Sequence, residues 1–201
     1  MILENKLDLT DQIALAKAEE KISKQKARQL FDSGDIHKAE VGKFAGLSFI
    51  HAYLFRDIYD FAGKIRDVNI AKGNFRFAPV MYLEASLKHI DAMPQSTLDE
   101  IVEKYVEMNV AHPFREGNGR ATRIWLDLML KKETRQVVDW NRVDKEEYLS
   151  AMQRSVVKDL ELKALLQQAL TNQIDDRALF MKGIDVSYYY EGYSEFKTEE
   201  L

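Results

Sequence analysis

Residues 112–123 read HPFREGNGRATR, and a helix-like run at 124–132 follows them without a break. Within the stretch, Gly117-Asn118-Gly119 allows backbone dihedrals that a Cβ would forbid, so successive N–H groups can turn inward on an anion. The unpaired N–H groups and the positive dipole end of the following helix face the same place. We therefore expect a polyphosphate site at the start of this helix.

The charged side chains of the stretch suit the same ligand. Arg120 and Arg123 are three apart on the expected helix, so they share a face and can offer forked bonds to phosphate oxygens. Glu116 is a hard oxygen ligand, suited to a Mg²⁺ that bridges phosphates. His112 ends a predicted helix, because Pro113 disfavours helix there, and its imidazole could take a proton from an attacking hydroxyl at neutral pH.

Each feature alone has an ordinary explanation. A histidine near a helix end is usually a packing or capping residue, and a lone GNG is usually a turn. Together the residues match HxFx(D/E)GNGRxxR, the signature of the Fic family, at every specified position. A chance match anywhere in the chain is on the order of 10⁻⁸ at average residue usage. The sequence therefore resembles Fic proteins.

The resemblance implies a mainly helical, all-α Fic fold with a short β-hairpin flap over the active site. It also implies a protein adenylyltransferase, which moves AMP from ATP to a tyrosine, threonine or serine hydroxyl of a target protein. His112 would be the base and Glu116 would hold Mg²⁺ on the α- and β-phosphates. Asn118 and its flanking glycines would form the anion hole, while Arg120 and Arg123 would contact the β- and γ-phosphates.

A second segment that resembles Fic proteins lies at 59–66, YDFAGKIR, and leads into two short extended runs at 68–71 and 75–78. A Gly-Asn turn between β-prone residues is a hairpin signal, although by itself it would be a plain surface turn. In Fic proteins the corresponding hairpin is the flap, and the target protein docks on its edge by strand-like backbone pairing. The flap region at 72–77 would border the nucleotide through Lys72, Gly73, Asn74 and Phe75, with Phe75 or Phe77 covering it.

The C-terminal stretch 187–192, SYYYEG, carries the third signal. Ser187 and Glu191 are four apart and would lie on one face of a helix that Gly192 can end. Alone this is an ordinary capped turn. Beside the Fic motif it matches (S/T)xxxE(G/N) and resembles the inhibitory motif of class III, self-inhibited Fic proteins. The resemblance implies that Glu191 pairs with Arg123 and obstructs the γ-phosphate.

A terminal inhibitory helix would act by competition for one guanidinium. While Glu191 holds Arg123, the γ-phosphate loses a bidentate partner and meets a like charge. We expect Glu191→Gly to raise transferase activity by orders of magnitude. Because the helix is small and terminal, it could be displaced reversibly, which makes Tyr188 a candidate for self-modification. The alternative role of Tyr188 is to pack the helix onto the domain.

Composition sets the remaining expectations. The chain has 201 residues, 46% apolar and 31% charged, with a net charge of −4 and no cysteine. This profile favours one domain over 1–201, without thiolate metal sites, and gives no general case for nucleic-acid or membrane binding. No signal segment or membrane-length apolar run stands out, so we expect a cytoplasmic, bacterial-type protein.

Helix-capping residues and helix-breaking residues predict the bounds of the helices. Thr97 with Glu100 forms a capping-box pattern before a helix at 98–111, which delivers His112 to the loop. Asn109, one turn earlier, either faces the same cleft or is a surface amide. The other expected helices lie at about 11–32, 41–59, 80–93, 119–132, 144–152, 159–170 and 175–181, with a short β-branched run at 136–139.

Three other functions remain open from the sequence. The same site could hydrolyse AMP from a modified protein, with Glu191 orienting a water. It could transfer another phosphate-containing group if the nucleotide bound in a different orientation. A non-catalytic nucleotide-responsive regulator is a third reading, which the presence of both His112 and Glu116 disfavours. The target protein and any homo-oligomer cannot be read from the residues.

Overall fold

The computed structural model describes residues 2–73 and 75–201, and its helices begin where the sequence supplies N-caps. The Asp11 carboxylate accepts the N–H of Ala14, and Thr97 with Glu100 forms a complete capping box. The helices are α1 (Gln12–Asp32), α2 (Phe44–Phe55), α3 (Val80–Ala92), α4 (Leu98–Ala111), α5 (Asn118–Thr134), α6 (Lys145–Ser155), α7 (Leu160–Gln168) and α8 (Arg177–Tyr190). Short 3₁₀ turns are η1 (Asp35–Lys38), η2 (Trp140–Arg142) and η3 (Thr198–Glu200).

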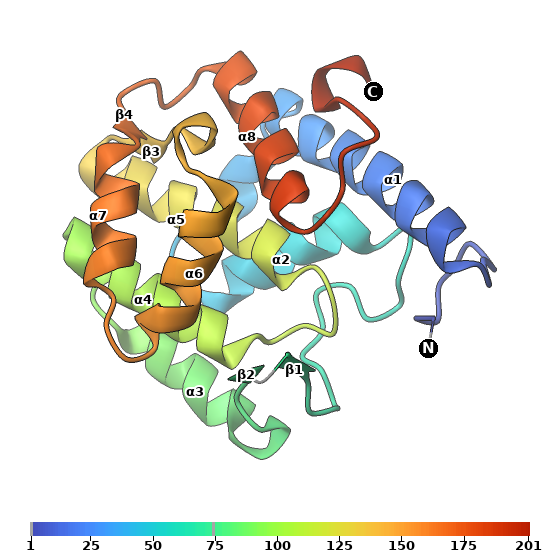
Figure 1. The fold of residues 1–201 in the computed structure, drawn as a ribbon, viewed down its shortest axis with the longest axis horizontal. Helices are drawn as coiled ribbons and strands as arrows, with labels where there is room; N and C mark the ends of the chain where they lie inside the picture. Colours follow the sequence, from blue (N-terminus) through green and yellow to red (C-terminus); the bar gives the residue numbers. More distant parts are fainter. Residues whose placement is uncertain (1, 74) are drawn as a thin grey trace.

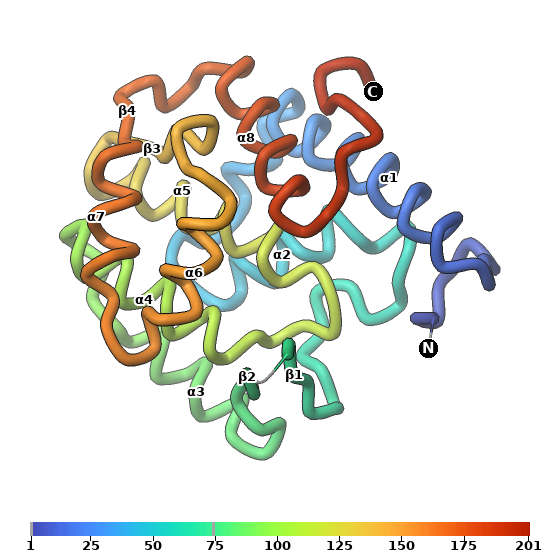
Figure 2. Tube along the Cα trace, in the orientation of Figure 1, coloured from blue at the N-terminus to red at the C-terminus, as the bar shows by residue number. Residues whose placement is uncertain are grey.

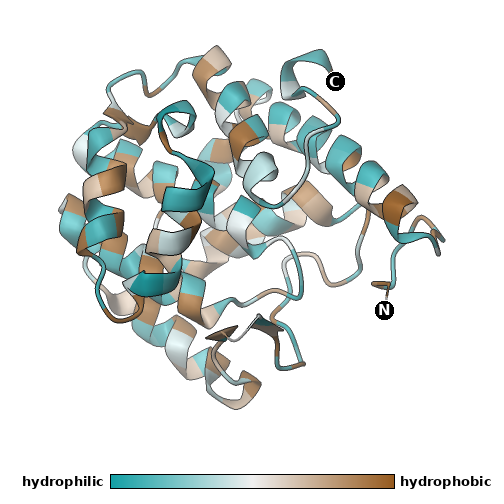
Figure 3. Cartoon of the chain, viewed as in Figure 1, coloured by the Kyte–Doolittle hydropathy of each residue, from teal (hydrophilic) through white to brown (hydrophobic). Residues whose placement is uncertain are grey.

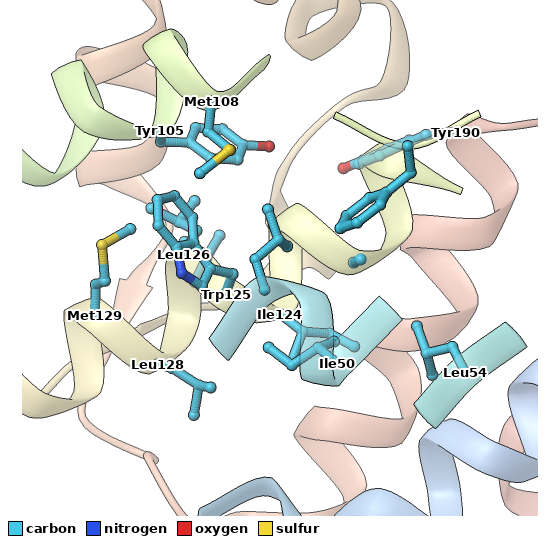
Figure 4. Close-up of a cluster of buried hydrophobic side chains, with 14 of the residues drawn as sticks. Ile50, Leu54, Tyr105, Met108, Ile124, Trp125, Leu126, Leu128, Met129 and Tyr190 are labelled. Carbon is cyan, nitrogen blue, oxygen red and sulfur yellow. The ribbon is translucent and has the colours of Figure 1, made fainter. Parts of the chain in front are cut away.

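Helix α5 lies at the centre of the fold and contacts α2, α4 and α8 (Figure 1). Its Trp125 and Leu126 are fully buried, and they pack in a cluster with Ile50 of α2 and Met108 of α4 (Figure 4). Burying side chains of this size contributes about 1.5–3 kcal/mol each. The helix that carries the GNGR residues is therefore held on several sides, which fixes the position of its N-terminus.

Two small antiparallel pairs complete the architecture. β1 (Ala71–Lys72) and β2 (Phe75–Arg76) form a hairpin at the edge of the helical body, with Lys72 opposite Phe75 (Figure 2). β3 (Val137–Val138) pairs with β4 (Leu170–Thr171), which lies more than thirty residues later in the chain. The mainly helical fold with one short hairpin is the class that the sequence predicted, and the prediction is confirmed.

The C-terminal segment folds back along α1, so α8, η3 and the first helix lie side by side (Figures 1 and 2). Lys24 of α1, with a 1% exposed side chain, binds the carboxylates of Glu20 and Asp185 and donates to the Phe196 carbonyl at 2.7 Å. The end of the described chain is thereby fastened to the N-terminal helix.

Several predicted boundaries were wrong. The helix expected at 41–59 spans 44–55, and the one expected at 159–170 ends at Gln168, before β4. The helix expected at 175–181 continues to Tyr190, so the inhibitory-motif residues form the last turn of a long helix. Apolar and polar residues share each helix (Figure 3), and among the described residues no helix is long and apolar enough to span a membrane.

Candidate active site

His112 stands at the C-cap of α4 in the left-handed conformation, with φ 48° and ψ 62°. Its Nδ1 lies 3.2 Å from the Asn109 carbonyl, which can accept only, so the proton sits on Nδ1 and Nε2 keeps its lone pair. The imidazole stacks on the Phe77 ring at 3.6 Å. Burial lowers the pKa of His112 to about 4, against its ordinary 6.5. The site thus presents a neutral imidazole with a free acceptor nitrogen.

The loop after His112 is closed by side chains that bind backbone. Asn118 makes both amide bonds to one residue, accepting the Phe114 N–H at 2.8 Å and donating to its carbonyl at 2.7 Å. His51 accepts the Gly63 N–H at Nδ1, so its Nε2–H donates to the Glu116 carbonyl at 2.7 Å. The His51 ring also stacks on fully buried Phe114 at 3.8 Å. His51 is therefore a structural histidine that shapes the loop.

Two glycines of the cradle are closely approached by neighbouring side chains. Gly117 has φ 78°, and a Cβ there would lie 2.6 Å from the Phe55 ring. At Gly119, the first turn of α5, a Cβ would lie 2.4 Å from Oε1 of Glu191. Glu191 therefore places its carboxylate directly on the helix N-terminus where an anion is favoured.

Glu116 and Arg120 form one charged group with Glu19 of α1. Arg120 donates to Glu19 at 2.5 Å and to Oε1 of Glu116 at 3.1 Å, and its side chain is 1% exposed. Glu19 also accepts the hydroxyl of Tyr193 at 2.8 Å and that of Tyr59. Burial acts to raise the pKa of Glu19, but Arg120 outweighs it and the pKa is lowered. Arg120 thus orients Glu116, whose side chain remains 47% exposed.

Arg123 has a different set of partners, although it shares a helix face with Arg120. Its Nε donates to the Ser187 hydroxyl at 2.7 Å, and its Nη2 donates to the Ser187 carbonyl at 3.0 Å and to Glu191 at 2.8 Å. The two guanidiniums therefore do not converge on a common protein partner. Arg123 is held by Ser187 and Glu191 at the C-terminal end of α8, and its guanidinium also lies 5.8 Å from the ring of Tyr148 in α6.

The Glu191 carboxylate is strongly stabilised as an anion. Burial acts to raise its pKa, but the charge and hydrogen bond of Arg123 outweigh burial and lower the pKa to about 2. Exposed Lys72 of β1 adds a longer contact, with Nζ 3.6 Å from Oε2. Gly192 follows with φ 93° and ends the helix, as the sequence predicted.

The Tyr188 side chain lies on the buried face of α8 and does not face solvent. It is 1% exposed, and its ring lies 5.3 Å from the Arg120 guanidinium, on which Tyr193 also packs at 4.7 Å. Tyr189 is the exposed neighbour, at 52%. Both motif arginines therefore hold the C-terminal segment, Arg123 through Glu191 and Arg120 through two aromatic rings.

The hairpin lies against His112. Phe77, just beyond β2, stacks on His112, and half-buried Phe75 meets the Phe77 ring edge-on at 5.0 Å. Lys72 and Gly73 are exposed at the tip, and Gly73 has open space around its Cα. Asn74, expected to contact nucleotide, lies outside the described residues.

Three residues to which the sequence reading assigned no part in the site support it. Glu19, His51 and Arg66 each bind a motif residue or its backbone from a distant part of the chain. Glu19 lies in α1, which is rich in lysines and glutamates, residue types that are seldom fully buried. Its paired tyrosines and arginine are far apart in sequence, so no local spacing signals the group.

Comparisons with known proteins show the family of the chain. The sequence profile described as Fic/DOC family matches residues 44–130. The chain is 35% identical over 136 residues to the protein adenylyltransferase VbhT of Bartonella schoenbuchensis, a match covering 61% of this chain and 28% of VbhT. It is 30% identical over 171 residues to the probable protein adenylyltransferase y4lH of Sinorhizobium fredii, covering 79% of this chain and 85% of that protein.

A solved structure shares the fold. BepC, a VirB-translocated effector protein of Bartonella tribocorum crystallised with bound AMPPNP, superposes with a TM-score of 0.68. The two chains are 20% identical, and the superposition covers 86% of this chain and 94% of the other. The helical body and hairpin therefore recur in a protein that holds an ATP analogue.

Proposed function

Since the chain belongs to the Fic/DOC family, we propose that it is a protein adenylyltransferase that transfers AMP from ATP to a tyrosine, threonine or serine hydroxyl of a target protein. The observation that carries the proposal is the state of His112. Its Nδ1 proton is committed to a backbone carbonyl, and within the described part of the chain Nε2 has no hydrogen-bond partner, beside a glycine cradle at a helix N-terminus. A base of this kind suits a hydroxyl nucleophile better than it suits a ligand-binding role alone.

In the proposed reaction, Nε2 of His112 takes the proton of the target hydroxyl while that oxygen forms a bond to the α-phosphorus. The bond from the α-phosphorus to the bridging oxygen breaks, and diphosphate leaves with its electron pair. The unpaired N–H groups at the start of α5 and the Arg123 guanidinium are placed to bind the phosphate oxygens. Their positive charge would also favour the charge that develops on the leaving group.

Glu116 is the proposed Mg²⁺ ligand, and its donor chemistry fits. It offers a half-exposed carboxylate whose protein hydrogen bonds, among the described residues, all go to Oε1. One carboxylate together with substrate phosphates is a usual way for proteins to bind Mg²⁺. When bound, the ion would neutralise charge on the α- and β-phosphates. Arg120, held by Glu19, keeps the carboxylate of Glu116 oriented for this role.

The target protein would dock along the hairpin. Ala71 and Lys72 of β1 are exposed, so an extended segment of the target can pair with the strand edge and bring its hydroxyl toward His112. Backbone pairing reads little sequence, which leaves the identity of the target to surfaces outside the hairpin.

We further propose that the chain is self-inhibited by α8, as in class III. Glu191 occupies the space over Gly119 and binds Arg123, so it takes both the position and the cationic partner of a terminal phosphate. Self-modification of Tyr188 would require α8 to leave its place, because the tyrosine is buried while the helix is docked.

Labelled ATP tests the proposed reaction. Purified Glu191→Gly protein is incubated with cell lysate, Mg²⁺ and ATP labelled at either the α- or the γ-phosphate. We expect label on protein from the α-position, none from the γ-position, and none after His112→Ala is added. Transfer of γ-label would instead show a phosphotransferase. If neither position labels protein, the AMP-transfer proposal fails, and release of AMP from an AMP-modified protein becomes the reaction to test.

A further inference from the structure

Arg66 lies between the hairpin and the base, in the segment that leads into β1. Its side chain is buried, at 4% exposure. Nε donates to the His112 carbonyl at 2.8 Å and Nη1 to that of Val68 at 2.7 Å. Nη2 donates to the carbonyls of Ala78 at 2.5 Å and Ala111 at 3.1 Å. One guanidinium therefore binds four backbone carbonyls from three stretches of chain.

These four carbonyls are not equivalent. Ala111 and His112 end α4, where helix carbonyls have no partner within the helix. Val68 and Ala78 stand just before and just after the hairpin. The planar guanidinium thus joins the end of the helix that carries the base to both ends of the flap.

Backbone bonds run beside the guanidinium. The Arg66 N–H donates to the Pro113 carbonyl at 2.8 Å, and the Ala78 N–H donates to the Val110 carbonyl at 2.9 Å. Phe77, the residue before Ala78, stacks on the His112 imidazole at 3.6 Å. Hairpin and base are consequently packed as one unit with Arg66 at its centre.

The buried charge of Arg66 is paired with backbone carbonyls, whereas a buried cation is usually paired with a carboxylate. No ion pair among the described residues includes it, so carbonyl dipoles alone compensate the buried cation. Burial lowers the pKa of this guanidinium from its ordinary value. A lysine could not replace it, since an ammonium offers three donors around one point and lacks the planar fork.

We propose that Arg66 is a positioning residue for the transfer reaction: it fixes the His112 peptide in its left-handed conformation and locks the flap to it. The separation between Nε2 of His112 and a hydroxyl presented along the flap is thereby set. This inference rests on the proposed function, because the geometry between His112 and the flap matters for catalysis only if His112 is the base of the transfer reaction. Misplacement of a reacting group by about 1 Å can lower a rate by about a hundredfold.

The matched control is Lys104, another buried cation that binds backbone on the same helix. It is 1% exposed and donates to the Met93 carbonyl at 3.1 Å and to Gln95 at 2.9 Å, toward the other end of α4. It also belongs to no ion pair among the described residues. Lys104→Gln therefore removes a comparable buried cation without touching the flap or the base.

The experiment introduces Arg66→Gln, Arg66→Lys and Lys104→Gln separately into the Glu191→Gly protein. For each variant we would measure kcat for AMP transfer, the Kd for ATP, and the thermal midpoint. We expect both Arg66 variants to lose about tenfold or more in kcat while the ATP Kd stays within about twofold, since the cradle is untouched. Lys104→Gln should lower the thermal midpoint yet keep kcat within about twofold of its parent.

Amide hydrogen exchange in the Glu191→Gly parent and its Arg66 variants supplies a readout that does not need activity. The Ala78 and Arg66 amides should exchange faster in both Arg66 variants, and Lys104→Gln should leave them protected. Equal kcat values for Arg66→Lys and Lys104→Gln would overturn the inference. Unchanged protection of the Ala78 amide in the Arg66 variants would also overturn it. If Arg66→Gln does not fold, the comparison of Arg66→Lys with Lys104→Gln decides the question. An inactive Glu191→Gly parent would instead remove the proposed function, and the exchange result would still decide whether Arg66 ties the flap.

Discussion

At the residue scale, the state of His112 gives a direct pH prediction. Because burial lowers its pKa to about 4, the imidazole stays neutral as pH falls from 8 through 6, whereas an unperturbed histidine would protonate near 6.5. The folded-state pKa lies below the unfolded one, so protonation of His112 costs stability that is present above about pH 6.5 and lost as pH falls below it.

Titration of the His112 ring signals by NMR checks this prediction, with His112→Ala used to assign the resonance. We expect a pKa well below 6.5 in the native chain. In the Glu191→Gly protein, the AMP-transfer rate should show no His112-dependent acid limb between about pH 6 and 8. A His112 pKa at or above 6.5 would contradict the account of the base.

The Glu19–Arg120 pair gives a second prediction at this scale. Both side chains are nearly fully buried, at 3% and 1% exposure. Removing one partner of a buried ion pair leaves an uncompensated charge, so Glu19→Ala should lower the free energy of unfolding by about 3–5 kcal/mol. Chemical denaturation measures this loss. Glu195→Ala, which removes a largely exposed partner of Lys17, is the control and should change stability by less than about 1 kcal/mol. A similar small loss for Glu19→Ala would show that the pair does not stabilise the fold.

At the scale of elements, contacts with Arg123 and with Glu19 both help to hold the C-terminal end of α8. Glu191 and Ser187 bind Arg123. Tyr193 lies just beyond α8, and its hydroxyl donates a hydrogen bond to Glu19 of α1. Tyr193→Phe removes that hydroxyl and keeps the ring on Arg120. We expect it to raise the AMP-transfer rate of the native chain severalfold, because a lost hydrogen bond to a charged group is worth about 1.5–3 kcal/mol, part of which stabilises docking.

Tyr189→Phe is the matched control for that variant. The exposed Tyr189 ring packs against the ammonium of half-buried Lys145, and among the described residues its hydroxyl has no hydrogen bond. Its transfer rate should equal that of the native chain. Equal rates for Tyr193→Phe and Tyr189→Phe would show that the Tyr193 hydroxyl does not help to dock α8.

Elements governed by local signals could be predicted from the sequence. The capping box correctly placed the start of α4, and Pro113 correctly placed His112 outside its C-terminal end. Pairing between distant segments could not be predicted, so β4 was read as helix although it pairs with β3. The length of α8 was missed for a related reason, since its burial against α1 and α5 extends a helix that local pattern alone ended at 181.

The candidate site divides in the same way. The contiguous motif predicted the cradle, and the resemblance of residues 187–192 to a Fic inhibitory motif implied the contact between Glu191 and Arg123, which the structure contains. Glu19 lies 101 residues from Arg120, and Arg66 lies 46 residues from His112. Contacts at such separations depend on tertiary packing, so no spacing rule in one sequence reveals them.

At the scale of the whole molecule, residues 194–201 form a strap, a C-terminal segment that packs against α1. Phe196 binds Glu20 and Lys24 through its backbone, and Thr198 binds Asp185 of α8. Ending the chain at residue 193 removes these contacts while leaving Glu191 in place. We expect the shortened chain to keep its helical circular dichroism and to transfer AMP faster than the native chain, because α8 loses its anchor.

Combining the shortening at residue 193 with Glu191→Gly tests whether the shortening acts through the Glu191 contact. In the Glu191→Gly background, the same shortening should add little to the rate, since the inhibitory contact is already gone. If the shortening raised the rate equally in both backgrounds, the strap would act on something other than the Glu191 contact.

The central claim is that Glu191 inhibits the site by holding Arg123 and occupying the cradle. The most direct measurement compares initial rates of AMP transfer at saturating ATP and Mg²⁺ for the native chain, Glu191→Gln and Glu191→Gly. The account predicts that Glu191→Gly is faster than the native chain by about a hundredfold or more, which corresponds to about 2.7 kcal/mol of barrier, with Glu191→Gln between them because it keeps the shape and loses the charge. Equal rates for all three proteins, each shown to be folded and to bind ATP, would contradict it.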